Sequence, residues 1–159
     1  MLVLAGACTS DEAQRAPVAP DDGIQLTGTI DGHRIAISDG EPEVVLGDCD
    51  PGDGDDLDLC VIARSIDGQT VGVVFENPAV FATAGSYPVS TAECEAVACD
   101  AVTTVAIVEL RTDAVSWLAL SGALDVRLSE GRYVADLRLE LGDGGSVSGT
   151  INVSAPATP

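Results

Sequence analysis

The sequence contains no lysine, and its 7 basic residues stand against 26 acidic ones, which gives a formal net charge of −19 at pH 7. A surface of this charge repels nucleic-acid phosphates and anionic lipid headgroups. Aromatic residues make up only 3% of the chain. Trp117 and Tyr133 fall on neighbouring expected strands, where packing at the core or its rim is the ordinary role of such residues. The composition therefore argues against nucleic acid as a partner and against an aromatic sugar-binding platform.

Residue types that commonly carry catalysis are also scarce. His33 is the only histidine and is expected at a strand end opposite Ile30. No Gly-x-Ser-x-Gly sequence accompanies it, so a serine-nucleophile triad has no support. The chain has no Cys-x-x-Cys spacing for zinc and no glycine-rich loop ahead of a helix for a nucleotide. We predict that the protein is not an enzyme, with a hydrolase that uses paired carboxylates as the remaining exception.

No segment of the chain approaches the run of about 18 apolar residues that a membrane-spanning helix needs. Instead, apolar and polar residues alternate from Gly23 onward, and turn signals recur between the alternating segments. This pattern is typical of short antiparallel strands. We predict an all-β domain over residues 23–155, an antiparallel β-sandwich or flattened barrel of about eight or nine strands, followed by a disordered tail at 156–159.

Three segments give more detailed expectations. The Asp31-Gly32 turn predicts a hairpin in which Leu26 lies opposite Ile37 and Gly28 lies opposite Ile35. A second Asp-Gly turn at residues 67–68 is expected to join strands at 57–66 and 69–75, with Asn77-Pro78 ending that hairpin. Residues 102–110 form an apolar, β-branched run that predicts a strand buried on both faces.

The last third of the chain predicts a three-stranded meander with one face in the core. Turns are expected at Glu130-Gly131 and at residues 143–145. The residues expected on the core face of the three strands are Leu118, Leu120, Gly122, Leu124, Val126 and Leu128; Tyr133, Ala135, Leu137, Leu139 and Leu141; and Val147, Gly149, Ile151 and Val153. Outward positions such as Arg138 and Glu140 are charged, so one face is expected to be wet.

The start of the chain resembles a bacterial lipoprotein signal. Leu4-Ala5-Gly6-Ala7-Cys8 ends a short apolar start and leads into a polar, proline-containing stretch. In that class the cysteine is acylated and becomes the N-terminus after cleavage. Residues 1–7 lack the full charged and apolar regions of a signal, and we expect the true start to lie upstream. Residues 8–22 then form a lipid-anchored flexible tether.

The odd number of cysteines fits this reading, because assigning Cys8 to lipid leaves four. Cys49, Cys60, Cys94 and Cys99 suffice for two disulfides in an exported protein. Three connectivities are open, and we favour Cys49–Cys60 with Cys94–Cys99, since each pair brackets a loop-like segment. Buried free thiols are the alternative.

An acidic run between residues 48 and 58 is the best candidate for a ligand site. Its glycines let the backbone curl, so its carboxylates could gather around Ca²⁺. It is not an EF-hand, since no start position places a glutamate twelfth. A solvated acidic loop is the simpler reading, with weak Ca²⁺ binding as the alternative. The candidate ligands are Asp48, Asp50, Asp53, Asp55, Asp56 and Asp58.

A broader resemblance covers most of residues 24–153. The segments Gly28-Thr29-Ile30-Asp31-Gly32, Gly85-Ser86-Tyr87-Pro88-Val89, Ser121-Gly122-Ala123-Leu124 and Val147-Ser148-Gly149-Thr150-Ile151 are similar to motifs of uncharacterised small β-rich bacterial lipoproteins. The resemblance implies an exported, disulfide-containing β-sandwich and no activity. Because Thr9, not aspartate, follows Cys8, it implies outer-membrane anchoring that faces the periplasm or the cell surface.

These features predict a membrane-anchored lipoprotein that acts as a non-catalytic binding or envelope structural module. Its partners would be the lipid bilayer, through Cys8, and an unknown protein or small ligand. The alternative is a Ca²⁺-dependent adhesion or binding protein that uses residues 48–58.

Overall fold

The computed structural model describes residues 22–47, 49, 57–64, 70–91, 104–112, 115–142 and 144–156. Within these ranges the chain forms ten strands and one short 3-10 helix. They are β1 (Gly23–Ile30), β2 (His33–Asp39), β3 (Glu43–Gly47), β4 (Asp58–Arg64), β5 (Thr70–Phe75), η1 (Pro78–Ala82), β6 (Gly85–Ser90), β7 (Val108–Thr112), β8 (Ser116–Ser129), β9 (Arg132–Leu141) and β10 (Ser146–Ser154).

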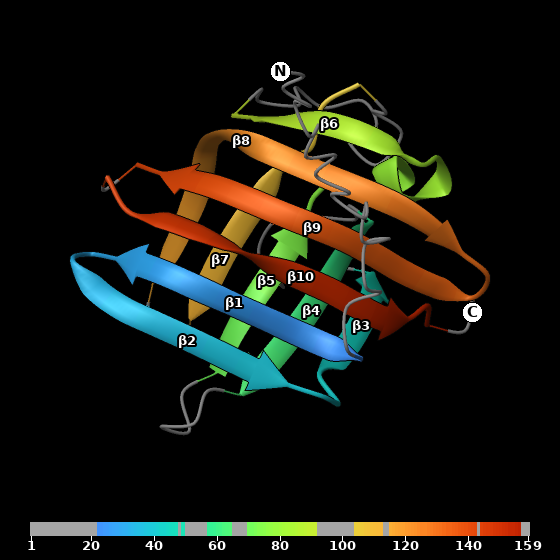
Figure 1. The fold of residues 1–159 in the computed structure, drawn as a ribbon, viewed down its shortest axis with the longest axis horizontal. Helices are drawn as coiled ribbons and strands as arrows, with labels where there is room; N and C mark the ends of the chain where they lie inside the picture. The colour runs from blue at the N-terminus through green and yellow to red at the C-terminus, as the bar shows by residue number, and fades with distance from the viewer. Residues whose placement is uncertain are drawn as a thin grey trace, which may run out of the picture.

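Nine of the strands form one antiparallel ladder in the order β2-β1-β10-β9-β8-β7-β5-β4-β3, and β6 pairs with β8 off this path. The sheet curls into a half-barrel. In Figure 1 the strands β2, β1, β10, β9 and β6 form a front layer, and β3, β4, β5 and β7 cross behind them. The expected all-β fold of about nine strands is confirmed.

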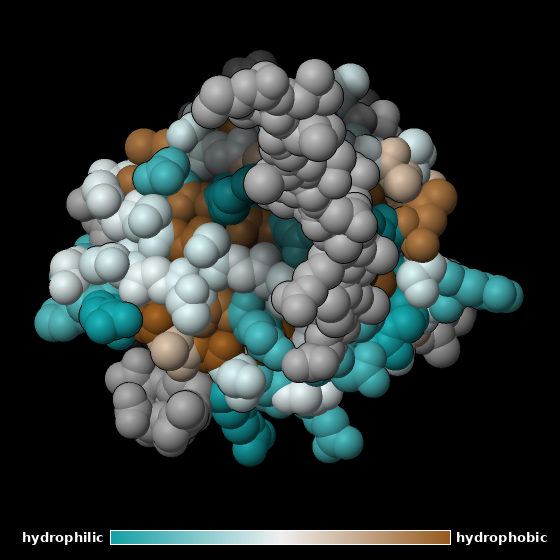
Figure 2. Space-filling view, in the orientation of Figure 1, coloured by the Kyte–Doolittle hydropathy of each residue, from teal (hydrophilic) through white to brown (hydrophobic). Residues whose placement is uncertain are grey.

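The core fills the space between the two layers. Alternate side chains of each strand point inward, which removes apolar surface from water and supplies the main stabilising term. The front face in Figure 2 is mainly hydrophilic, with apolar groups showing between polar ones. The largest fully buried side chains come from both layers and include Phe75, Leu26, Leu59, Leu110, Leu137 and Ile151.

The first hairpin has the predicted register. Leu26 pairs with Ile37 and Gly28 pairs with Ile35. The turn residue Asp31 has φ 49° and Gly32 has φ 74°, which are the positive angles that a type I′ turn requires. His33 lies opposite Ile30 and is exposed, as expected.

The second hairpin, between β4 and β5, is also present, but its register differs from the prediction. Arg64 pairs with Thr70, whereas a two-residue turn at 67–68 would place Ile66 opposite Gln69. Five residues therefore separate the described partners, and the turn itself lies outside the described residues. After β5 the chain enters η1 directly behind Asn77, so the predicted end of the hairpin is confirmed.

The strand predicted at residues 102–110 is wrong in its bounds. The strand β7 begins only at Val108 and continues to Thr112. Before it, Ala106 forms an isolated bridge with Val89 of β6, and the Asn77 side chain binds backbone groups on either side of that bridge. These partners occupy the backbone groups just ahead of β7, where the Ile107 carbonyl also accepts the Glu76 N–H over 3.2 Å. The predicted burial is confirmed at the described end of the run, because Ala106, Ile107 and Val108 are all buried.

In the meander, the core faces predicted for β9 and β10 are confirmed, but that of β8 is wrong in part. Leu124 and Val126 are buried as predicted, whereas Leu118, Leu120 and Leu128 are exposed and Ala119, not predicted in the core, is fully buried. The register shifts by one residue between Ala119 and Ser121. Such a bulge reverses which residues face the core, and it lies where β8 passes from the rear layer to the front layer. Gly122, with φ 144°, follows it, and a side chain there would collide with the Arg138 carbonyl.

Candidate binding site at the end of the half-barrel

The structure places only part of the cysteine and aspartate sites predicted from the sequence. Cys49 and Cys60 form a disulfide, with their Cα atoms 6.3 Å apart, so this predicted pair is confirmed. Asp58 lies at the start of β4 and is 8% exposed. The other predicted site residues lie outside the described residues: Cys8, Cys94, Cys99, Asp48, Asp50, Asp53, Asp55 and Asp56.

The disulfide ties the start of the acidic run to the sheet, and an arginine lies beside it. Arg111 of β7 donates from Nη1 to the Cys49 carbonyl over 3.5 Å and from Nη2 to Glu109 over 3.2 Å. One cationic group therefore sits at the base of the run. In the part of the chain that the structure describes, no group of three His, Cys, Asp or Glu side chains is placed to hold a metal ion.

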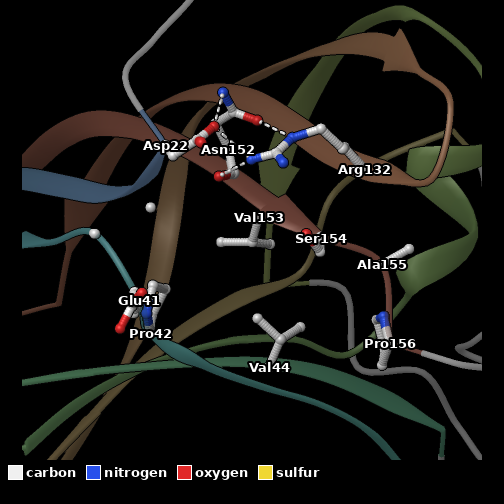
Figure 3. Close-up of a pocket in the computed structure, with 12 residues that line it drawn as sticks. Asp22, Glu41, Pro42, Val44, Arg132, Asn152, Val153, Ser154, Ala155 and Pro156 are labelled. Atoms are coloured by element: carbon white, nitrogen blue, oxygen red, sulfur yellow. Dashed lines mark hydrogen bonds and ion pairs between the residues drawn. The ribbon is translucent and has the colours of Figure 1, made fainter.

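A hollow of about 380 Å³ opens at one end of the half-barrel, and we call it the end hollow. It lies between the end of β10 and the connection from β2 to β3 (Figure 3). Val153 of β10 and Val44 of β3 extend into it from opposite sides, and Pro42 and Pro156 lie at its rim. Its lining residues are Asp22, Gly23, Gly40, Glu41, Pro42, Val44, Arg132, Asn152, Val153, Ser154, Ala155 and Pro156.

One wall of the end hollow is a hydrogen-bonded cluster around Arg132. Its Nε donates to Asn152 Oδ1 over 2.7 Å, and its Nη2 donates to the Asn152 carbonyl over 2.9 Å and to Asp22 over 2.7 Å. The Asn152 amide also donates to Asp22 over 3.4 Å. Asn152 is 8% exposed, and bonds to a charged donor offset the cost of burying it. The cluster therefore fixes the first described residue, Asp22, against β10.

A glycine allows this corner to close. Gly23 has φ 101°, and a Cβ there would collide with the Asp39 carbonyl and with Gly40. A larger residue would push β1 away from the end of β2. Asp22 and the β2–β3 connection can thus border the same hollow only because residue 23 has no side chain.

A second hollow of about 600 Å³ lies on the other side of the β2–β3 connection, and we call it the β2/β4 hollow. Asp39 there accepts the Arg64 N–H over 2.9 Å and the Glu41 N–H over 3.0 Å. These two bonds, that from Arg64 first, hold the pKa of the Asp39 carboxyl below its ordinary value of 3.8. The lining residues are Ser38, Asp39, Gly40, Glu41, Glu43, Ile62, Arg64 and Thr70.

No family model, curated protein or solved structure matches this chain. Within the described ranges, none of the chain's helices has the length and apolar character needed to cross a membrane. The chemistry of the site must therefore be argued from its own residues. The end hollow offers apolar side chains beside the carboxylate of Glu41, while Asp22 and Arg132 are paired with each other over 2.7 Å. Such a surface suits a partner that presents a small apolar group beside a cation.

The sequence did not indicate Arg132, Asn152 or Asp22 as site residues. Asp22 and Arg132 are 110 positions apart, and only the pairing of β1 with β10 and of β10 with β9 brings them together. A weak signal was present: Asn152 interrupts the apolar run from Ile151 to Val153 near the end of a strand.

Proposed function

We propose that this chain is an exported lipoprotein, anchored through acylated Cys8, whose half-barrel is a non-catalytic binding module with its partner site at the end hollow. The observation that carries the proposal is the disulfide between Cys49 and Cys60. Disulfides persist in oxidising compartments and are rare in the reducing cytosol. The pairing supports export, and a second pair between Cys94 and Cys99 would leave Cys8 as the remaining cysteine.

The position of Asp22 supports a role close to the anchor. Cys8 and the first described residue, Asp22, are 14 positions apart. Fully extended, such a tether reaches at most about 50 Å, and a flexible chain of this length has a root-mean-square span of roughly 20 Å. Because Asp22 borders the end hollow, the proposed partner site would lie on the tethered side of the domain, near the membrane surface.

The charge of the domain supports a protein or small-molecule partner instead of the lipid surface itself. A net charge of −19 opposes adsorption to anionic headgroups, so attachment would depend on the acyl chains. The carboxylate of Glu41 at the end hollow favours a cationic group on the partner. The tether would keep the end hollow within about 50 Å of the bilayer.

Intact mass spectrometry of the protein, expressed in a bacterial host from its natural gene with the upstream sequence included, tests the proposal. We expect a chain that starts at Cys8, carries a diacylglyceryl-sized increment and, without reduction, takes up no alkylating reagent. The Cys8→Ser variant should lose the increment and leave the membrane fraction, whereas Cys49→Ser should keep both. An unmodified N-terminus with free thiols would overturn the proposal.

A second candidate, Ca²⁺-dependent binding by residues 48–58, is favoured by one observation. The disulfide joins Cys49 near one end of the run to Cys60 just beyond the other, which limits the spread of the carboxylates between them. Chain closure of this kind reduces the entropy lost on gathering ligands. Arg111 at the base of the run lowers the local negative charge and would keep the affinity weak.

A further inference from the structure

We propose that two copies of this chain associate through the free edge of β2, which pairs with its own copy as an antiparallel strand and joins the two front layers into one sheet. The inference does not depend on the acylation of Cys8 or on the end hollow.

The edge of β2 is open in the described part of the chain. Among the described strands, β1 alone pairs with β2. Ile30 and His33 flank the two-residue turn and form a hydrogen-bonded pair, so the pairs alternate from there along the hairpin. It follows that Arg34, Ala36 and Ser38 direct their N–H and C=O groups away from β1. All three residues are exposed.

The other borders of the sheet are protected, and that of β2 is not. β6 contains Pro88, and its outer side is occupied: Ser90 donates to the Ala106 carbonyl over 3.0 Å, and Ala106 donates to the Pro88 carbonyl over 2.9 Å. β3 is only 5 residues long. β2 is 7 residues long and contains no proline, and its charged residues Arg34 and Asp39 lie towards its two ends, so its centre at Ala36 has neither of the usual residue types that block pairing at an edge.

The sequence of β2 is complementary to itself in one antiparallel register. With the two-fold axis at Ala36, Arg34 of one copy lies opposite Ser38 of the second copy, and Ala36 lies opposite Ala36. All the outward-directed backbone groups then find partners. The same register places His33 opposite Asp39 of the second copy, a favourable pair. The register shifted by two pairs towards the turn would instead set Arg34 against Arg34.

Space and charge are consistent with a second copy in this position. The β2/β4 hollow, about 600 Å³ in volume, leaves open space beside Ser38, and a strand added there would lie next to the Arg64 N–H of β4, which is bonded to Asp39. The small Ala36 side chains permit close approach at the axis. Each copy carries a net charge of −19, and this general repulsion is screened by salt. Association should therefore strengthen as the salt concentration rises.

Sedimentation equilibrium tests the proposal directly, because it measures the mass of the full chain in solution. All samples carry Cys8→Ser, so that the Cys8 thiol cannot link two copies, and non-reducing gel electrophoresis confirms that no other cysteine does. The protein should move from its monomer mass of 16.1 kDa towards twice that mass as its concentration increases, and the dissociation constant should fall at least threefold between 0.05 and 0.5 M NaCl, on the order expected from screening. The monomer mass at every concentration up to about 1 mM would overturn the proposal.

Variants of Ala36 assign the interface. Ala36→Pro removes an N–H that has no partner among the described residues and blocks strand addition, and Ala36→Lys sets two like charges face to face at the axis. Each should weaken the dimer at least tenfold. Thr27→Lys adds the same charge one strand inward, on the same face, and should leave the dimer intact. A dimer that persists in the folded Ala36→Lys protein would refute the β2 interface even if Ala36→Pro failed to fold.

Discussion

Replacement of Asn77 by alanine should destabilise the domain far more than its small size suggests. Asn77 is fully buried; its amide donates to the Val105 carbonyl over 2.6 Å, and its side-chain oxygen accepts the Ile107 N–H over 3.0 Å. Alanine leaves a donor and an acceptor without these partners. A buried polar group that loses its partner costs about 1–3 kcal/mol. Because Ile107 is 1% exposed and Val105 is partly accessible to water, we expect a total loss of about 3 kcal/mol.

The loss can be measured by urea unfolding, followed through the fluorescence of the single tryptophan, Trp117. For a domain of roughly 135 residues, about 3 kcal/mol corresponds to a fall of about 10 °C in the melting temperature. Thr27→Ala, at an exposed position of β1, is the control and should change the free energy of unfolding by less than about 0.5 kcal/mol. A loss below about 1 kcal/mol for Asn77→Ala would refute the reasoning, since it would mean that water or backbone movement satisfies both groups.

Three further outcomes are expected. The pKa of Asp39 is lowered in the folded state, so its stabilising contribution is present above pH 3.8 and is lost as the pH falls through the folded pKa. In urea titrations, the difference in stability between wild type and Asp39→Asn should therefore shrink below about pH 4. A difference that stays constant from pH 7 to pH 2 would contradict this. Leu124→Ala, at a fully buried position, should lower the free energy of unfolding by about 2–5 kcal/mol. Leu120→Ala, at an exposed position, should lower it by less than about 0.5 kcal/mol. Equal losses would argue against the bulge in β8. If residues 48–58 bind Ca²⁺ weakly, 10 mM CaCl₂ should raise the melting temperature by roughly 1–5 °C relative to the same concentration of MgCl₂. Alanine substitution at Asp53 and Asp55 should abolish this increase. Equal melting temperatures in the two salts would exclude Ca²⁺ binding by residues 48–58.

Local chemistry explains why much of the strand pattern could be predicted. The Asp31-Gly32 turn restricts its hairpin to one geometry, and the register of Leu26 with Ile37 follows from counting. The regular alternation from Tyr133 to Val153 leaves only one face that can be buried. Where a turn and an alternating pattern agree, the sequence contains the necessary information.

Other features depend on contacts between distant parts of the chain. The bulge between Ala119 and Ser121 is needed because β8 must change layers, and a regular alternation of leucines gives no sign of it. Val108 begins β7 because Asn77 and β6 hold the preceding residues. The end hollow likewise requires β1, β3, β9 and β10 to meet at one corner, so none of its polar residues stands out in the linear pattern.

The pairing of β1 with β10 has a mechanical consequence. Gly23 lies opposite Asn152, so the chain enters and leaves the domain at the same end of one antiparallel pair. Tension applied between Asp22 and Ser154 would break the hydrogen bonds of this pair one after another instead of loading them together in shear. Arg132 bridges Asp22 and Asn152 where that opening would begin, so its bonds would break first, before β1 is pulled from β2 and β10 and before the buried Ile24 and Leu26 are exposed.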